Sequence, residues 1–188
     1  MHRTLHRHSA GARSRRLAAS VCATVALCAC ALALPTASAS AATVPEGMFG
    51  MNDWSLPSEG TMANVRGAGV RRWRAGMFWQ YVENTRGQRN WSFYDNLASA
   101  SARQGTSLLM IVGGCPQWAC SSVNGPPRTP DALAAQRAFL RDAVARYGSN
   151  GSFWSQHPEL PRTPVTEWQV GNEVNHPEYW KPSPNAAE

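Results

Sequence analysis

Residues 164–176 read PVTEWQVGNEVNH, an apolar run followed by a polar cluster. The β-branched and aromatic side chains predict a strand that runs to Val170, and Gly171 ends it. The residues directly after the strand are polar or acidic: Asn172, Glu173, Asn175 and His176. In α/β proteins the buried parallel strands open onto solvent at their carboxyl ends, where reactive side chains gather. The segment therefore predicts a functional site at the end of a parallel strand.

Strands and helices alternate along the chain that precedes this segment. Strands are expected at residues 48–52, 70–75 and 107–112, and helices at residues 59–65, around 94–102 and at 130–147. Residues 107–112, SLLMIV, are typical of a strand buried on both faces of a parallel sheet. The alternation predicts the α/β class, namely a (β/α)8 TIM barrel of which this chain carries about the first four β/α units. A doubly wound nucleotide-binding sheet is disfavoured because no G-x-G-x-x-G or phosphate-binding loop follows these strands.

Two of the expected helices carry clear end signals. The first is the helix expected around residues 94–102, which Gly105 is placed to cap at its carboxyl end. The second helix is expected to start after Thr129 as N-cap, with Pro130 in the first turn, and to end at Gly148. The expected buried faces are Tyr94, Leu97, Ala98 and Ala102 in the first helix, and Leu133, Leu140, Val144 and Tyr147 in the second.

Residues 1–41 have the regions of a secretory signal peptide. Arginines crowd the start, residues 17–35 form an apolar run, and residues 37–41, ASASA, offer cleavage sites. We therefore expect a secreted protein in which residues 42–188 form the N-terminal part of a barrel domain, with no membrane contact after cleavage. Twin-arginine export at Arg15-Arg16 and lipid attachment near Cys28 stay open as other routes. An uncleaved anchor is disfavoured because the run is short for a membrane span.

Removal of the leader changes the charge and the cysteine content. The whole chain has a formal charge of +6, but five of its eighteen basic residues and none of its twelve acidic residues precede residue 42. The remainder has thirteen basic and twelve acidic residues, so a nucleic-acid partner is not indicated. Only Cys115 and Cys120 remain, and two nearby cysteines in an exported chain predict a disulfide.

The expected strand at residues 70–75, VRRWRA, contains three arginines. Charges within a strand indicate an exposed sheet edge. At the mouth of a barrel, an arginine near the strand end would instead organise a carboxylate or bind a hydroxyl group of a ligand. Arg74 has the position for this second role, and pairing with Glu83 or Asp95 is the structural alternative.

The strand end from Trp168 to Asn175 resembles the fourth-strand signature of clan A glycoside hydrolases, the retaining (β/α)8-barrel glycosidases. In many of these a strand ends in Trp, and Asn-Glu follows a few residues later. The resemblance implies that Glu173 is the general acid/base and that Asn172 hydrogen-bonds the sugar 2-hydroxyl. A carboxylic acid that protonates the glycosidic oxygen lowers the barrier to loss of a poor leaving group. We also expect Trp168 and Trp180 to surround Glu173 and partly bury it.

The likeness covers most of residues 48–188. Family members carry in order an Arg, a Trp five residues later, an acidic residue, a Trp and an Asp, which here are Arg74, Trp79, Glu83, Trp91 and Asp95. A third strand that leads into Pro-x-Trp is similar to residues 116–118. The resemblance implies a carbohydrate substrate, a poly- or oligosaccharide, that is bound by these residues: Arg74, Trp79, Trp118, Asn175 and Trp180.

A retaining glycosidase also needs a second carboxylate as nucleophile. In the family this residue ends the seventh strand, so the resemblance places it beyond Glu188. We therefore expect the 188-residue chain alone to be inactive. No cofactor is implied, because acid/base chemistry on an acetal requires none.

Other functions fit parts of the sequence. A non-catalytic secreted carbohydrate-binding protein on a degenerate barrel would use the eight Trp residues to stack sugars. Glu173-x-x-His176 matches half of a metal site, but such a pair is expected on a helix and in two copies, so no metal is predicted. A serine hydrolase is disfavoured because no G-x-S-x-G motif occurs. The sequence does not indicate an oligomeric state.

Overall fold

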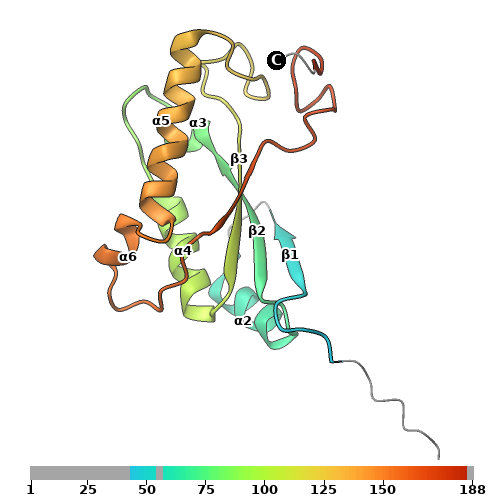
Figure 1. Ribbon diagram of the computed structural model, residues 1–188, viewed down its shortest axis with the longest axis vertical. Coiled ribbons are helices and arrows are strands. Elements are labelled where there is room, and N and C mark those ends of the chain that lie inside the picture. Colours follow the sequence, from blue (N-terminus) through green and yellow to red (C-terminus); the bar gives the residue numbers. More distant parts are fainter. Residues whose placement is uncertain (1–42, 54–56, 186–188) are drawn as a thin grey trace, which may run out of the picture. The chain divides into compact units, whose positions relative to one another are not determined.

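Four parallel strands and the helices between them make up the part of the chain that the computed structural model describes, residues 43–53 and 57–185 (Figure 1). In chain order the elements are β1 Gly50–Asp53, α2 Glu59–Gly67, β2 Arg72–Phe78, α3 Trp79–Val82, α4 Ser92–Gln104, β3 Ser107–Gly113, α5 Pro130–Tyr147, α6 Ser152–Gln156 and β4 Glu167–Val170. The expected signal peptide at residues 1–41 lies outside the described residues. Within them, no helix is long and apolar enough to cross a membrane.

The strands lie in the sheet in the same order as in the sequence, β1-β2-β3-β4, and every neighbouring pair is parallel. Helices connect each strand to the next, and α4 and α5 run along one face of the sheet (Figure 1). Strands wound in this way are the repeating unit of a (β/α) barrel. The structure therefore confirms the predicted fold class, with four β strands of a partial barrel.

The two faces of the sheet differ because side chains alternate along each strand. One face carries Trp73, Met77 and Met110, which are buried in the core with Leu97 of α4 and Phe139 of α5. The other face is more polar and less buried, and the strand register brings together on it Asn52, Arg72, Arg74, Leu109, Glu167 and Gln169. This second face leads to the strand ends where the polar cluster was predicted.

The arginines of β2 do not mark a sheet edge. β2 pairs with β1 on one side and with β3 on the other, so the edge interpretation is wrong. Arg72 and Arg74 are accommodated because both point to the open face, where Arg72 pairs with Glu167 at 2.7 Å.

The end signals of the helices are confirmed. Gly105 adopts the left-handed conformation with φ of 61°, which a glycine adopts without steric cost. Thr129 accepts a hydrogen bond from the Ala132 amide at 3.1 Å, as an N-cap residue does. The four residues expected on the inner face of α4 are all buried. The short helices α3 and α6 were not predicted.

The buried face of α5 agrees only in part with the predicted one. Tyr147 is buried as predicted and Leu133 and Leu140 are partly buried, whereas Val144 is 45% exposed and the other buried residues are Ala132, Phe139 and Ala143. The prediction of Leu133, Leu140 and Val144 followed the bulkier apolar residues, each of which stands one position after a buried residue and therefore points about 100° away around the helix. The two alanines leave room for α5 to approach the core closely, and Phe139 fills the space between them.

Candidate functional site

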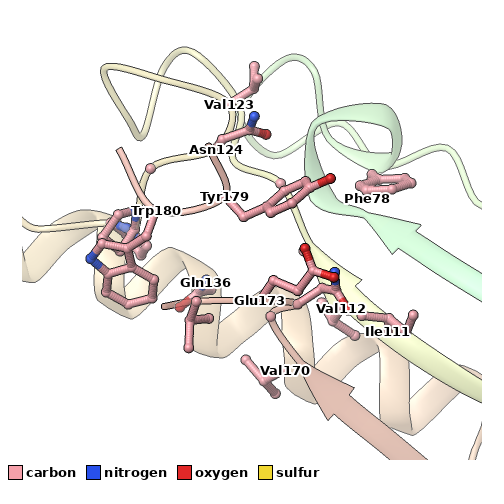
Figure 2. A pocket seen from close by; sticks show the side chains of 18 of the residues that line it. Phe78, Ile111, Val112, Val123, Asn124, Gln136, Val170, Glu173, Tyr179 and Trp180 are labelled. Atoms are coloured by element: carbon pink, nitrogen blue, oxygen red, sulfur yellow. The ribbon is translucent and has the colours of Figure 1, made fainter. Parts of the chain in front are cut away.

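A groove with a volume of about 670 Å³ lies at the carboxyl ends of β2, β3 and β4. Its polar lining comes from Asn52, Arg74, Asn124, Gln136, Asn172 and Glu173. Two loops enclose it, the β3–α5 loop at residues 114–129 and the segment after β4 at residues 171–181. Figure 2 shows the carboxylate of Glu173 between the strand ends below and the ring of Tyr179 above. Glu173 and Asn172 thus lie directly after a parallel strand, at the position predicted from the sequence.

Arg74 holds three side-chain amides by their oxygen atoms. Its Nη1 donates to Asn52 Oδ1 at 2.6 Å, and its Nη2 donates to Gln169 Oε1 and Asn172 Oδ1, both at 2.9 Å. Because a guanidinium group only donates, it fixes which end of each amide faces it. The oxygen of Asn172 is therefore engaged, and its NH2 group is left to donate to a ligand. Arg74 lines the groove, and one of its hydrogen bonds positions Asn172.

Glu173 is exposed, in contrast to the partial burial expected from the sequence. Trp168 does not approach it, because Trp168 is in register with Met110 and packs against the core on the helical side of the sheet. The backbone of Glu173 has φ of 48°, in the left-handed region that non-glycine residues adopt at a cost. Such strain of order 1–3 kcal/mol is commonly found where the surroundings hold a functional side chain in place.

The two loops of the groove are joined by a pair of hydrogen bonds. The Lys181 amide donates to the Asn124 carbonyl at 3.1 Å, and Arg128 Nη2 donates to the Lys181 carbonyl at 3.0 Å. We call this pair of bonds the clasp. The predicted disulfide between Cys115 and Cys120 is present at the start of the same β3–α5 loop. The disulfide therefore holds the start of the β3–α5 loop, and the clasp holds it at Asn124 and Arg128.

Trp79 lies in the core and not in the groove. It is the first residue of α3 and directly follows Phe78, which lines the groove, but its indole belongs to the hydrophobic core. It is 1% exposed, stacks on Phe139 at 5.7 Å between ring centroids, and donates from Nε1 to Glu83 Oε2 at 3.0 Å. No face of this indole is open to a sugar, which differs from the role that the resemblance implied.

Glu83 is buried at the end of α3 and anchors the following loop. Its carboxylate accepts hydrogen bonds from Trp79, from the Gly87 amide at 2.8 Å and from Arg89 at 2.9 Å. Burial acts to raise the pKa of Glu83, but the three hydrogen bonds and the charge of Arg89 outweigh it and hold the pKa below its usual range. Glu83 is thus a structural anion and does not line the groove.

Trp118 is also packed away from the groove. Its Nε1 donates to the Glu83 carbonyl at 3.0 Å, and its ring meets Trp79 edge-on at 5.3 Å. The guanidinium of Arg86 lies over the ring, 5.3 Å from its centroid. The face that would stack on a pyranose is therefore occupied by a cation.

Of the last two residues that were expected to contact a sugar, one lines the groove and the other does not. Trp180 lines the groove, whereas Asn175 is exposed in the turn after Glu173 and is not part of the lining. Sequence reasoning missed Gln169 and Tyr179. Strand alternation could have found Gln169, because it shares the face of β4 that is in register with Ile111 at the groove. Tyr179 reaches the groove through consecutive turns, which no local sequence pattern predicted.

Glu173-x-x-His176 is the pair from which no metal site was predicted. Among residues 43–53 and 57–185, no group of three or more His, Cys, Asp or Glu side chains is placed to hold a metal ion. His176 Nδ1 instead accepts a hydrogen bond from the Glu178 amide at 3.2 Å. The groove therefore offers the carboxylate of Glu173 and several side-chain amides, and Arg74 donates to the oxygen atoms of two of these amides.

Comparison with known proteins gives structural likenesses. No protein-family model and no curated protein matches the sequence. A family 39 glycoside hydrolase from Bacteroides cellulosilyticus WH2 superposes with a TM-score of 0.51 at 24% identity, over 67% of this chain and 24% of that chain. An endoglucanase Cel5A from Pseudomonas stutzeri gives a TM-score of 0.46 at 12% identity, over 68% and 39%. A β-galactosidase from Halorubrum lacusprofundi gives 0.44 at 19% identity, over 66% and 20%.

The first of these likenesses supports the fold assignment. Each of the three solved structures is a glycoside hydrolase, and the first shares with this chain the winding of a (β/α) barrel. The chain spans about a quarter of the length of that first structure. At such identity the likeness concerns the fold, so the role of each groove residue has to be argued from its chemistry.

Proposed function

We propose that this chain is the N-terminal part of the catalytic domain of a secreted retaining glycoside hydrolase, with residues 1–41 as its signal peptide. Glu173 would protonate the glycosidic oxygen, and the amide of Asn172 would donate to the sugar 2-hydroxyl. The supporting observation is that both residues emerge together from the end of β4 into one groove, with the Asn172 oxygen held by Arg74. A carboxylic acid and an oriented amide are the groups that glycosidic cleavage requires on this side of the sugar.

In the first proposed step Glu173 would give a proton to the glycosidic oxygen, the bond from that oxygen to the anomeric carbon would break, and a nucleophilic carboxylate would form a bond to the same carbon. In the second step Glu173, now a carboxylate, would take a proton from a water molecule that attacks the anomeric carbon and displaces the nucleophilic carboxylate. The exposure of Glu173 gives water access to it. Among the described residues, Glu173 is the only carboxylate that lines the groove. We therefore propose that the nucleophile is supplied from outside these 188 residues and that the chain alone is inactive.

The single carboxylate also favours a second candidate, a secreted protein that binds carbohydrate without cleaving it. Binding needs the oriented amide of Asn172 and an aromatic wall such as Trp180, but no second acid. The two candidates make opposite predictions for Glu173, because only the enzyme uses its proton.

Replacement Glu173→Gln in the natural full-length protein distinguishes them. For the enzyme we expect kcat on glycosides with poor leaving groups to fall by about 10²–10⁴, the usual contribution of a general acid, and to fall much less on dinitrophenyl glycosides. Glu178→Gln is the matched control, because Glu178 is exposed on the same segment and does not line the groove. Equal turnover of Glu173→Gln and the unmodified protein would reject the catalytic role. If the unmodified protein, Glu173→Gln and Glu178→Gln all bind sugar and none of them turns it over, the result would support the second candidate, a protein that binds carbohydrate without cleaving it.

A further inference from the structure

Gln169 lies on the polar face of β4, and both ends of its side-chain amide are engaged. Its Oε1 accepts hydrogen bonds from Arg74 Nη2 at 2.9 Å and from Arg74 Nε at 3.3 Å. Its Nε2 donates to the Gly171 carbonyl at 2.7 Å. A guanidinium group only donates and a carbonyl oxygen only accepts, so both neighbours require the same orientation of the amide. Gln169 therefore connects Arg74 to the backbone that leaves the strand.

The backbone that leaves β4 turns sharply before it reaches the groove. Gly171 has φ of 73° and Glu173 has φ of 48°, so both residues are in the left-handed region. A Cβ atom at Gly171 would lie 2.8 Å from Val174 Cγ1, so the space as well as the conformation favours glycine there. Glu173 adopts this conformation at a cost, and such a backbone persists where the surroundings hold it in place.

Three hydrogen bonds hold this turn. The Gly171 amide donates to the Val112 carbonyl at 2.8 Å, and the His176 amide donates to the Glu173 carbonyl at 2.7 Å. The third bond is the one from Gln169 to the Gly171 carbonyl, and it ties the turn to the side chains of the polar face. Arg74 joins the same network, because its Nη2 donates to Asn172 as well as to Gln169.

We propose that Gln169 is a positioning residue that holds residues 171–173 in the turn that brings Asn172 and Glu173 into the groove. Its amide oxygen shares Arg74 with Asn172, and its NH2 group fixes the peptide between Gly171 and Asn172. Without Gln169, that peptide would be free to rotate, and the carboxyl group of Glu173 would be present but no longer aimed at the glycosidic oxygen. The catalytic part of this inference rests on the proposed function, whereas the hold on the turn does not.

Gln169→Met in the full chain tests the hold on the turn. Methionine has nearly the length and volume of glutamine, but it cannot bond to Arg74 or donate to the Gly171 carbonyl. We expect hydrogen exchange of the Gly171 and His176 amides, followed by NMR, to become at least about fivefold faster, the factor that corresponds to the loss of one hydrogen bond.

Glu167→Met is the matched control, because Glu167 is a partly buried polar residue on the same face of the same strand. Its ion pair with Arg72 lies away from the turn, so exchange at Gly171 should stay unchanged. The buried Ala98 in α4 reports on opening of the whole domain. Unchanged exchange at Gly171 in Gln169→Met, the same increase in both variants, or an equal increase at Ala98 would overturn the proposal.

Hydrolysis by the natural full-length protein separates this inference from the proposed function. The substrates are paired methyl and dinitrophenyl β-glycosides of glucose, galactose, mannose and xylose. Methanol is a poor leaving group that needs the proton, so Gln169→Met should lower kcat on the methyl glycosides by about 10- to 100-fold and much less on the dinitrophenyl glycosides. A loss of stability alone would lower both rates equally.

An equal loss on both substrates, or no loss on either, would reject Gln169 as a positioning residue and leave the glycosidase in place. Faster exchange at Gly171 in Gln169→Met, together with no cleavage by the unmodified protein, would support the hold on the turn and reject the proposed function.

Discussion

Arg72 and Arg74 stand two residues apart on the same face of β2, yet we expect their replacement by lysine to have different costs. Arg72 forms an ion pair with Glu167, in which the two side chains are 53% and 44% exposed. Such exposed pairs contribute about 0–1 kcal/mol, and lysine preserves the charge, so Arg72→Lys should cost less than about 0.5 kcal/mol. This variant is the matched control for Arg74→Lys.

Arg74 is partly buried, and its fork donates to three amide oxygens at once. An ammonium group on a flexible chain cannot reproduce that planar fork, and we expect it to keep one of the three contacts. Loss of two hydrogen bonds at about 1 kcal/mol each predicts a decrease of about 2 kcal/mol in the free energy of unfolding. Urea unfolding of the full chain, followed by tryptophan fluorescence, measures both variants under identical conditions.

The same replacement also tests how Asn172 is positioned. Without the fork, the amide of Asn172 is free to turn its oxygen toward the groove, so glycoside affinity should fall in Arg74→Lys and stay constant in Arg72→Lys. If Arg74→Lys costs no more stability than Arg72→Lys, the fork does not hold the amides as described, and the argument for an oriented Asn172 fails with it.

Two further predictions concern the core. The ring of Phe139 is stacked between Trp79 and Trp91, and both centroid distances are 5.7 Å. Phe139→Ala removes this ring and should lower the free energy of unfolding by about 3–5 kcal/mol in the same urea assay. A cost below about 1 kcal/mol would contradict this packing. Burial raises the pKa of Tyr94 to about 12, although the Phe78 amide that donates to its hydroxyl acts in the opposite direction. The folded state therefore favours neutral Tyr94, which contributes stability below pH 10 that is lost as pH rises toward 12. Burial also raises the pKa of Tyr147, so absorbance at 295 nm should show two tyrosines, Tyr94 and Tyr147, that ionise only above pH 11 or on unfolding.

The sequence predicted those features that depend on neighbouring residues. Capping at Thr129 and the left-handed turn at Gly105 depend on a few adjacent positions, so their signals are complete in the local sequence. The same is true of the strand that delivers Asn172 and Glu173. Apolar runs and breaker residues are enough to place a polar pair at the end of a parallel strand.

The misassigned features depend on residues far apart in the chain. Which face of α5 is buried depends on the room left by Ala143 beside Phe139, which the size of its apolar residues alone does not reveal. Arg74 and Asn172 are separated by 98 positions, and their contact requires the register of two pairs of strands, β2 with β3 and β3 with β4. The exposure of Glu173 after β4 and the burial of Trp79 at the start of α3 likewise depend on the assembled fold. The residue types predicted which polar groups follow β4. The positions, contacts and exposure of these groups depend on the assembled fold.

The clasp has a consequence for changing the specificity of this groove. Because Lys181 bonds to Asn124 and to Arg128, the two loops share backbone and side-chain contacts at defined positions. An insertion or deletion in one loop alone would shift these partners out of alignment and release the other loop as well. Grafting and directed evolution should therefore exchange residues 114–129 and 171–181 together, as a single cassette with two segments.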